Sequence, residues 1–420
     1  MENNKSQVII IGAGVIGICT AYYLQKFGIG VTVLEQNEIS SGASSGNAGL
    51  IVPSHSIPLS SPDALKMGLK SIFEKQSPLY IQPKFDLKLF RWLFNFVKNC
   101  NAKNIKKVTR TCIDFSVASS NEYSKLIDQE NLNCNFVKNG TLSLFSSTDM
   151  FDQYIKKYKL LEENGISVKK MSTEEICDNY PQVKSNIAGG LLFKDDGHIN
   201  PQKFVKELSK IVTSNGGKII ENTKVTGFEI QSNKILKIQT NFEDFTADHI
   251  VIAAGAWSPL LSEIIGDDLP IQPAKGYSIT IPQDENKINI PMMLVEAKIG
   301  ANPLSDKYFR LAGTLELSGF NFSINKKRIQ KIIDSGQDFL QKENFKYISE
   351  AKIWYGFRPL TPDGLPIIEK SSKVKNLTFA SGHGTLGMTL GPITGLTVAE
   401  IITENPTTMN TKPFSLNRFN

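Results

Sequence analysis

Three glycines spaced as Gly12-x-Gly14-x-x-Gly17 follow an apolar run near the start of the chain, and Glu35 lies eighteen residues after the third glycine. Gly12 allows a tight turn, Gly14 lets the backbone approach a pyrophosphate, and Gly17 permits close packing of a helix on a strand. The N–H groups that begin this helix would face the phosphates, and Glu35 would accept hydrogen bonds from a ribose 2′-hydroxyl. The spacing therefore predicts a dinucleotide site, for NAD or FAD.

The ten residues 40–49, directly after the second expected strand, have almost exclusively small side chains. A linker of this composition would be flexible. Ligands of open α/β sheets bind at the ends of the strands. We therefore favour the interpretation that the segment passes close to a bound cofactor, where bulky side chains are excluded.

Alternating strand and helix patterns would position these motifs. Residues 7–39 are predicted to form a β-α-β unit whose helix ends at Gly28, a typical C-cap. Residues 218–248 are predicted as the short strands of a meander, which leads into an apolar strand ending at Ala254-Gly255. The C-terminal region contains a second strand–turn–helix, with a strand over 377–380, a glycine-rich turn and a final helix.

Composition narrows the class of protein. With 420 residues, the chain is expected to form two domains. Its 47 basic and 41 acidic residues are spread without a long run of one sign, so nucleic acid is not indicated as a partner. The hydrophobic content of 40% is typical of a globular protein.

The cysteines and histidines give no sign of a disulfide framework or a metal site. The five cysteines include no CxxC pair, and the four histidines have no ligand-like spacing. No apolar run reaches the roughly 20 residues that span a bilayer. The first strand is expected almost at the N-terminus, which leaves no room for a signal peptide. We therefore expect a cytoplasmic protein without a metal.

Five sequence blocks lie in order along essentially the whole chain: Gly12-Ala-Gly-Val-Ile-Gly17, Ser41-Gly-Ala-Ser-Ser-Gly-Asn-Ala-Gly49, Pro273-Ala-Lys-Gly-Tyr277, Gly356-Phe-Arg-Pro-Leu-Thr-Pro-Asp-Gly-Leu-Pro366 and Gly382-His-Gly-Thr-Leu-Gly-Met388. Together they resemble the D-amino-acid oxidase-like superfamily of FAD-dependent amine oxidoreductases. The first block is common to many FAD and NAD proteins, whereas the last two are much more specific.

The resemblance implies an α/β fold, in which a Rossmann-like FAD-binding domain is interleaved with an α+β substrate domain on a mostly antiparallel sheet. Residues 1–60, 185–265 and 350–420 would form the FAD-binding domain, and residues 61–184 and 266–349 the substrate-binding domain. The implied reaction is oxidative deamination of D-amino acids to 2-oxo acids and ammonia, with hydride passing from Cα to flavin N5. Glycine, sarcosine, proline or another secondary amine is the alternative substrate, and a flavoprotein without amine chemistry is a further alternative.

The resemblance also assigns roles to single residues. Arg358 matches the arginine that binds the substrate carboxylate, although it could instead pair with an acid such as Asp363. Arg310 would either contribute to the site or pair with Glu316. Tyr277 and His55 are further candidates for the catalytic pocket, with packing roles as their alternatives.

Contacts with FAD are expected from five segments and one single position. These are Gly12, Ala13, Gly14, Val15, Ile16 and Gly17; Glu35 and Gln36; Ser44, Ser45, Asn47, Ala48 and Gly49; Val225; Ala254, Gly255 and Trp257; and Gly382, His383, Gly384, Thr385, Leu386, Gly387 and Met388. Backbone N–H groups of the last turn would stabilise the anionic reduced flavin. Some relatives attach flavin through a histidine after the second strand or a cysteine near the C-terminus. This chain has Asn47-Ala48 in that loop and no cysteine after Cys177, so non-covalent FAD is expected.

Residues 85–98 are dense in aromatic residues with basic residues between them. They would form either a helix packed in the substrate domain or a helix on the cytoplasmic face of the inner membrane. In the second case the protein would be peripheral and would pass electrons to quinone. Oxygen is the alternative electron acceptor.

Overall fold

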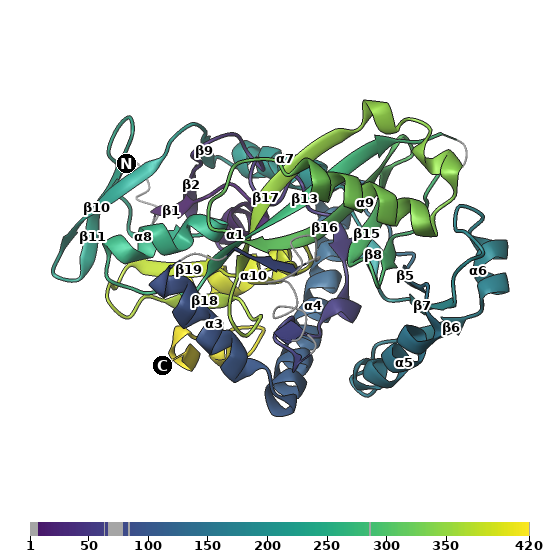
Figure 1. Cartoon of the computed structure of the whole chain (residues 1–420). Coiled ribbons are helices and arrows are strands. Elements are labelled where there is room, and N and C mark those ends of the chain that lie inside the picture. The colour runs from purple at the N-terminus through teal and green to yellow at the C-terminus, as the bar shows by residue number, and fades with distance from the viewer. Residues whose placement is uncertain (1–6, 63, 66–78, 83–84, 285–286, 420) are drawn as a thin grey trace.

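The computed structural model describes residues 7–62, 64–65, 79–82, 85–284 and 287–419. Two large sheets dominate it (Figure 1), and segments from both halves of the chain contribute to each. The hairpin of β10 (Val225–Gln231) and β11 (Lys234–Thr240) lies at one end of the molecule. Helices α5 (Thr148–Glu162) and α6 (Thr173–Asn179) lie at the other end.

The first sheet is of the Rossmann type. Its strand order is β18 (Ile367–Lys370), β19 (Leu377–Ser381), β12 (His249–Ile252), β1 (Gln7–Ile11), β2 (Gly30–Leu34) and β9 (Lys218–Ile220). All neighbours are parallel except β18 and β19. Strands β1 and β2 are almost wholly apolar because both faces of a parallel sheet are buried.

Helices cover both faces of this sheet. Val8 and Ile10 share a core with helices α1 (Val15–Lys26), α4 (Ala102–Glu130), α7 (Pro201–Ser214) and α10 (Gly387–Ile402). Ile9 and Ile11 face the other way, toward α8 (Ser258–Ile264) and the β10–β11 hairpin. This alternation follows from the two-residue period of a strand.

The β-α-β prediction is confirmed, and the helix ends as expected, since Gly28 takes a left-handed φ of 78° just after α1. The meander prediction is wrong for residues 218–220. These form β9, which pairs parallel to β2 after the crossover helix α7 and so extends the Rossmann sheet. Of the strands predicted for residues 218–248, only β10 and β11 form an antiparallel hairpin, with Phe245 bridged to Ile238.

The second sheet is mostly antiparallel. Its order is β17 (Lys352–Leu360), β13 (Gln272–Pro282), β16 (Tyr308–Leu317), β15 (Ile299–Ser305), β14 (Met292–Leu294), β5 (Thr141–Phe145), β7 (Gly189–Phe193) and β6 (Val168–Met171), and β4 (Leu79–Ile81) pairs with β16. A short pair, β3 (Leu50–Ile51) and β8 (Gly197–His198), completes the strands of the described residues. The expected α/β class, with two such sheets, is confirmed.

Two strands lie at the predicted domain boundaries. Strands β7 and β17 belong to the second sheet, and they fall in residues 185–193 and 350–360, which the prediction places in the FAD-binding domain. The domain boundaries stay a prediction.

The two faces of the second sheet differ in side-chain size. One face is apolar and packs against α9 (Lys326–Phe339), with Tyr277, Ile279 and Leu311 in its core. The opposite face has small residues at adjoining positions of β13 and β17, of which Gly276 and Gly356 are paired. This second face can therefore approach other groups closely.

Helix α3 (Leu87–Asn99) lies on the outside of the molecule (Figure 1), where Lys88 forms an ion pair with Glu263 of α8. In the described part of the chain, no helix combines the length and apolarity needed to cross a bilayer.

Candidate functional site

The turn before α1 is shaped by two glycines. A Cβ on Gly12 would lie 2.7 Å from the carbonyl oxygen of Ala253, and one on Gly17 would lie 1.9 Å from the carbonyl oxygen of Gly12. Gly12 also has a φ of 111°, which side chains disfavour. The tight turn and the close helix–strand contact predicted for these two residues are therefore present.

Glu35 and Ser44 meet the backbone of this turn. Oε2 of Glu35 accepts a hydrogen bond from the Ala13 N–H at 2.8 Å, and Oε1 accepts one from the Asn37 N–H at 3.0 Å. Burial raises the pKa of Glu35, while these backbone N–H groups oppose the rise. Oγ of Ser44 accepts from the Val15 N–H at 3.0 Å. The small-residue loop therefore lies at the N-terminus of α1.

The second sheet holds this loop by its backbone. Nη1 of Arg310 donates to the carbonyl oxygens of Ser45 and Asn47, each at 2.7 Å. Nδ2 of Asn302 donates to the Ala48 carbonyl at 3.1 Å. Burial lowers the pKa of Arg310 to about 10, so the guanidinium stays charged. Arg310 is thus a positioning residue for the loop.

Neither role expected for Arg310 is observed. Among the described residues that line the cavity, Arg310 does not occur. Glu316 forms its ion pair with Arg328 instead, with Nε 2.9 Å from Oε1, and both side chains are buried. Because the loop carbonyls take both hydrogen bonds of Nη1, Arg310 acts through the loop.

A cavity of about 1670 Å³ is lined by residues of both sheets. Typical ligand pockets measure roughly 300–1,000 Å³, so this one has room for more than a small substrate. Glu35 and Val225 line one part, the start of α10 lines another, and β14–β17 line a third. A dinucleotide and a substrate both fit an arrangement of this kind.

Most of the predicted ligand residues line this cavity. They are Gly12, Gly14, Val15, Ile16, Glu35, Gln36, Ser44, Asn47, Ala48, His55, Val225, Ala254, Gly255, Trp257, Arg358, His383, Gly384, Thr385, Leu386, Gly387 and Met388. Five further described residues that were predicted as FAD ligands do not line the cavity but belong to the backbone around it. They are Ala13, Gly17, Ser45, Gly49 and Gly382.

Arg358 extends from β17 across the small-residue face of the second sheet. A Cβ on Gly276 would lie 1.9 Å from Nη1 of Arg358, so the guanidinium lies directly over this glycine. Nη1 donates to the Thr314 carbonyl at 2.8 Å, which is the one hydrogen bond that Arg358 makes within the described residues. Burial lowers the pKa of Arg358 to about 10, which leaves it charged at neutral pH. Its remaining donors are available to a bound anion.

Thr314 is a functional candidate that sequence reasoning missed. It lies at an irregularity of β16 with a φ of 62°, a strained conformation for a β-branched residue. Its Oγ1 is buried and has no hydrogen-bond partner among the described residues. Strain beside a buried arginine is typical of binding sites, but no sequence signal marks a threonine in a strand.

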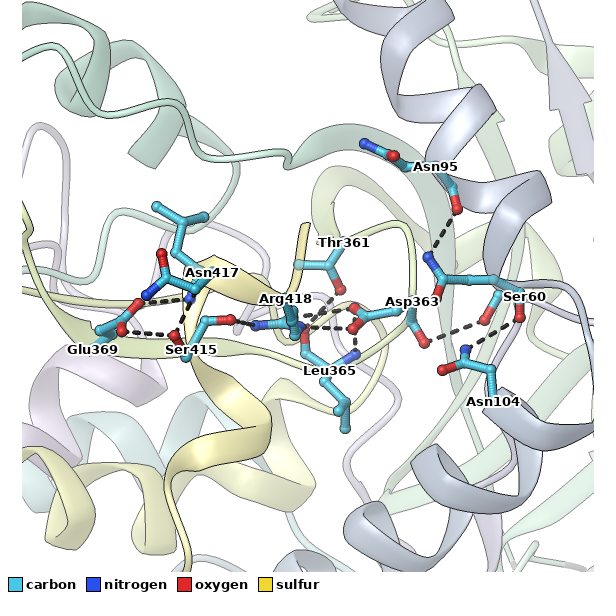
Figure 2. A network of polar contacts seen from close by, with 12 residues as sticks. Ser60, Asn95, Asn104, Thr361, Asp363, Leu365, Glu369, Ser415, Asn417 and Arg418 are labelled. Carbon is cyan, nitrogen blue, oxygen red and sulfur yellow. Dashed lines mark hydrogen bonds and ion pairs between the residues drawn. The ribbon is translucent and has the colours of Figure 1, made fainter. Parts of the chain in front are cut away.

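Asp363 does not pair with Arg358. Figure 2 shows its carboxylate facing Arg418, whose Nε lies 2.7 Å from Oδ2 and whose Nη2 lies 3.2 Å from Oδ1. Arg418 also donates to the carbonyl oxygens of Leu365 and Ser415. Arg418, near the C-terminus, thus forms the ion pair with Asp363 that was considered as a structural role for Arg358.

Tyr277 faces away from the cavity, which corrects its expected place in the pocket. Its ring lies in the core on the opposite face of the second sheet, and its hydroxyl accepts from the Asn325 N–H at 3.3 Å. Strand parity explains this, because Tyr277 alternates with Gly276 along β13.

Both candidate histidines line the cavity in the neutral form. Burial lowers the pKa of His55 to about 4 and that of His383 to about 3. Nε2 of His383 lies 3.0 Å from Oγ1 of Thr394, which anchors the imidazole to α10. The backbone of the turn that follows His383 remains the part of this segment that faces a ligand.

Within the described residues, no group of three histidine, cysteine or carboxylate side chains could hold a metal ion. The glycine turn, the carboxylate of Glu35 and the long cavity instead fit a dinucleotide cofactor.

Comparisons with known proteins agree with this geometry. The family model described as FAD dependent oxidoreductase matches residues 7–401. The chain is 32% identical over 410 residues to a D-amino acid dehydrogenase of Vibrio vulnificus, covering 95% of this chain and 97% of that protein. It is 31% identical over 398 residues to a D-amino acid dehydrogenase of Helicobacter pylori, covering 94% of this chain and 95% of that protein.

A solved structure shows the same fold. The crystal structure of glycine oxidase from Geobacillus kaustophilus superposes with a TM-score of 0.79 at 21% identity, with 99% of each chain covered. The family match covers nearly the whole chain, and the cofactor that it names fits the cavity. The protein therefore belongs to the family of FAD-dependent oxidoreductases, and its cofactor is FAD.

Proposed function

We propose that the protein catalyses the FAD-dependent oxidative deamination of D-amino acids to 2-oxo acids and ammonia. The observation that carries the proposal is the buried guanidinium of Arg358, which has a single protein partner among the described residues and lies in the cavity. A planar guanidinium binds a carboxylate through two parallel hydrogen bonds. The two D-amino acid dehydrogenases at 31–32% identity support this choice of substrate.

The chain's own residues would bind and orient the substrate. Arg358 would hold the carboxylate over Gly276, and Oγ1 of Thr314 would accept a hydrogen bond from the amine. FAD supplies the hydride acceptor for the Cα–H bond when it is bound. A fixed carboxylate leaves the hydrogen of one enantiomer aimed at the acceptor, whereas the other enantiomer would place a bulky group there.

The test is anaerobic bleaching of the flavin by a panel of amines. We expect reduction by D-alanine and other D-amino acids but not by their L-enantiomers. Arg358→Lys should slow reduction and weaken substrate binding, because an ammonium cannot reproduce the two-point contact. Bleaching by glycine, sarcosine or proline but not by D-alanine would move the assignment to those amines. Normal turnover of D-alanine by the lysine variant would remove Arg358 from the site.

We also propose that the FAD is held non-covalently. The support is the loop Asn47-Ala48, where a histidine would be needed for the attachment seen in some relatives. Acid precipitation should therefore release the yellow colour into the supernatant. Colour that stays in the pellet would contradict the proposal.

We further propose that helix α3 contacts an anionic membrane surface and that the electron acceptor is a membrane quinone rather than oxygen. Three side chains of α3 are buried, namely Leu89, Trp92 and Phe96, and Nε1 of Trp92 donates to the Leu360 carbonyl at 3.0 Å. The outer face is apolar and exposed. Its residues are Leu87, Phe90, Phe94 and Val97, and Phe85, which precedes the helix, is also exposed.

Charge complements this outer face of α3. Exposed cations follow it along the chain: Lys98, Lys103, Lys106, Lys107 and Arg110. Helix α8 adds the exposed side chains of Leu260 and Ile264, and the ion pair of Lys88 with Glu263 joins the two helices. An apolar surface bordered by cations is the pattern of a helix that lies on anionic lipid.

A further inference from the structure

A row of paired residues crosses the cavity-side face of the second sheet. In strand order it consists of Trp354, Ser278, Ala312, Gly300 and Met293. The two end residues are large, whereas the three between them have the smallest side chains. Since a side chain's size sets the local height of a sheet's surface, the row forms a trough with Trp354 and Met293 as its ends.

The trough is open to the cavity. Four of its five residues, Trp354, Ala312, Gly300 and Met293, line the cavity, whereas Ser278 is buried outside the lining. Beyond Met293 the cavity continues along Val295, Tyr154, Tyr158 and Met150. The surface that extends from the trough is therefore apolar and aromatic.

The carboxylate-binding guanidinium lies at the side of the trough. Nη1 of Arg358 is 2.8 Å from the carbonyl of Thr314, and Thr314 lies two residues from Ala312 along β16. Gly300 is the partner of Ala312 on the next strand. Two residues along a strand span about 7 Å and one strand step spans about 5 Å, so Gly300 is roughly 9 Å from Thr314, whose carbonyl the guanidinium contacts. That separation suits a side chain of leucine size or larger.

We propose that this trough is the subsite for the substrate's side chain and that it selects D-amino acids with bulky apolar or aromatic side chains, such as D-phenylalanine, D-methionine and D-leucine. The inference rests on the proposed function, because the carboxylate must be at Arg358. A D-alanine methyl group would leave the trough empty. Gly300 and Met293 are then specificity-determining residues.

The polar groups at the far end of the cavity define the competing class of substrate. Nζ of Lys298 donates to the Tyr154 hydroxyl at 2.8 Å. Oε1 of Glu296 accepts from the N–H groups of Ser146 and Ser147, whereas its Oε2 is buried without a partner among the described residues. A long cationic side chain could reach this carboxylate, so D-arginine belongs in the test.

Gly300 allows a well-controlled experiment. A Cβ at this position would have Nδ2 of Asn302 as its nearest neighbour, at 3.4 Å, and Cβ of Ala48 at 3.9 Å. Gly300→Ala should therefore fold normally and serve as the control. Gly300→Leu should fill the trough. Met293→Trp should block the end of the trough opposite Trp354, and its side chain would not face the small-residue loop.

The readout is the ratio of kcat/KM for D-phenylalanine to that for D-alanine, measured on enzyme with matched FAD content. We expect a ratio of at least ten for the wild type, a fall of at least tenfold in Gly300→Leu and Met293→Trp, and a change of less than threefold in Gly300→Ala. An unchanged ratio in both large variants, or a wild-type preference for D-arginine or D-alanine, would overturn the inference.

A binding measurement separates this inference from the proposed function. The dissociation constant of 3-phenylpropanoate, taken by calorimetry without turnover, should be at least tenfold lower than that of propanoate, and Gly300→Leu should remove the difference. If no D-amino acid reduces the wild-type flavin, the proposed function fails and this assignment fails with it. If D-alanine reduces the flavin but neither the ratio nor the binding difference responds to the variants, the trough alone is excluded.

Discussion

Asp363 forms a two-point ion pair with Arg418, near the end of the chain, although Arg358 is only five residues away in sequence. Both side chains are largely buried, with exposed fractions of 6% and 15%. The C-terminal segment therefore fixes the turn that follows β17 (Figure 2). The guanidinium of Arg358 is not needed for this turn and lines the cavity.

Arg418→Ala should destabilise the protein by about 3 kcal/mol, because it leaves a buried carboxylate without its partner. The free energy of unfolding in urea measures this effect. Lys210→Ala is a suitable control, since its ion pair with Glu207 is exposed and should contribute less than about 1 kcal/mol. Equal effects of the two substitutions would show that the buried pair adds nothing to stability.

Gly46→Val should abolish tight FAD binding. A Cβ at Gly46 would lie 1.9 Å from the ring of Trp354, so the small-residue loop must move away from the second sheet. Gly42→Ala, in the same loop, has no atom within 4 Å of the new Cβ and should bind FAD normally. Flavin content after purification distinguishes the two. Normal flavin content in Gly46→Val would mean that the loop's position does not matter for the cofactor.

Glu35→Gln should weaken FAD binding by about 1–3 kcal/mol, the range for a hydrogen bond to a charged group. The amide oxygen can still accept from the Ala13 N–H, but the NH2 group cannot accept from the Asn37 N–H. Fluorescence titration of the apoprotein with FAD gives the dissociation constant. If that constant is unchanged, the ribose contact lies elsewhere.

Acid should destabilise the protein through its histidines. Burial lowers the pKa of His55, His198 and His249 to about 4 and that of His383 to about 3. Each folded pKa is below the ordinary value of about 6.5, so the stabilisation is complete above pH 6.5 and is lost as the pH falls toward the folded values.

Each such histidine contributes a slope of about 1.4 kcal/mol per pH unit between those limits. Urea titrations at pH 7, 6 and 5 should show the loss, and His249→Gln should make the dependence shallower by one such slope. An identical pH dependence in that variant would show that His249 protonates as easily in the folded protein as in the unfolded chain.

Substitution of one exposed and one buried aromatic residue of α3 tests whether its outer face contacts a membrane. Phe94→Glu should abolish binding to vesicles that contain anionic lipid while activity with a soluble dye persists, because Phe94 is exposed. Trp92→Glu should instead destabilise the fold, since it buries an unpaired carboxylate. Vesicle co-sedimentation and thermal unfolding provide the two measurements. Vesicle binding by Phe94→Glu at the wild-type level would exclude the membrane contact.

The parts of the fold that follow local rules were predictable from sequence. The first β-α-β unit, its glycine turn and Gly28 depend on neighbours in the chain, and each is where the pattern predicted it. Strand β9 was misassigned because three residues after Gly216-Gly217 give no periodicity, and only pairing with β2 defines their sheet.

The site residues also divide into those that local motifs predict and those that depend on distant parts of the chain. Arg358 and the glycines belong to recognisable motifs. The face on which Tyr277 lies depends on strand parity in the assembled sheet, and the partner of Asp363 comes from 55 residues further along the chain. The strain of Thr314 and the row that includes Gly300 arise from the register of several strands, which a single sequence does not encode locally.

The position of β1 has a consequence for synthesis of the protein. Its neighbours in the Rossmann sheet are β2, made soon afterwards, and β12, made more than 200 residues later; β12 in turn pairs with β19 near the C-terminus. The nascent N-terminal unit therefore has an open, apolar strand edge until β12 emerges, and β12 then has an open edge until β19 emerges near the end of synthesis. Chaperones are expected to cover these edges in turn.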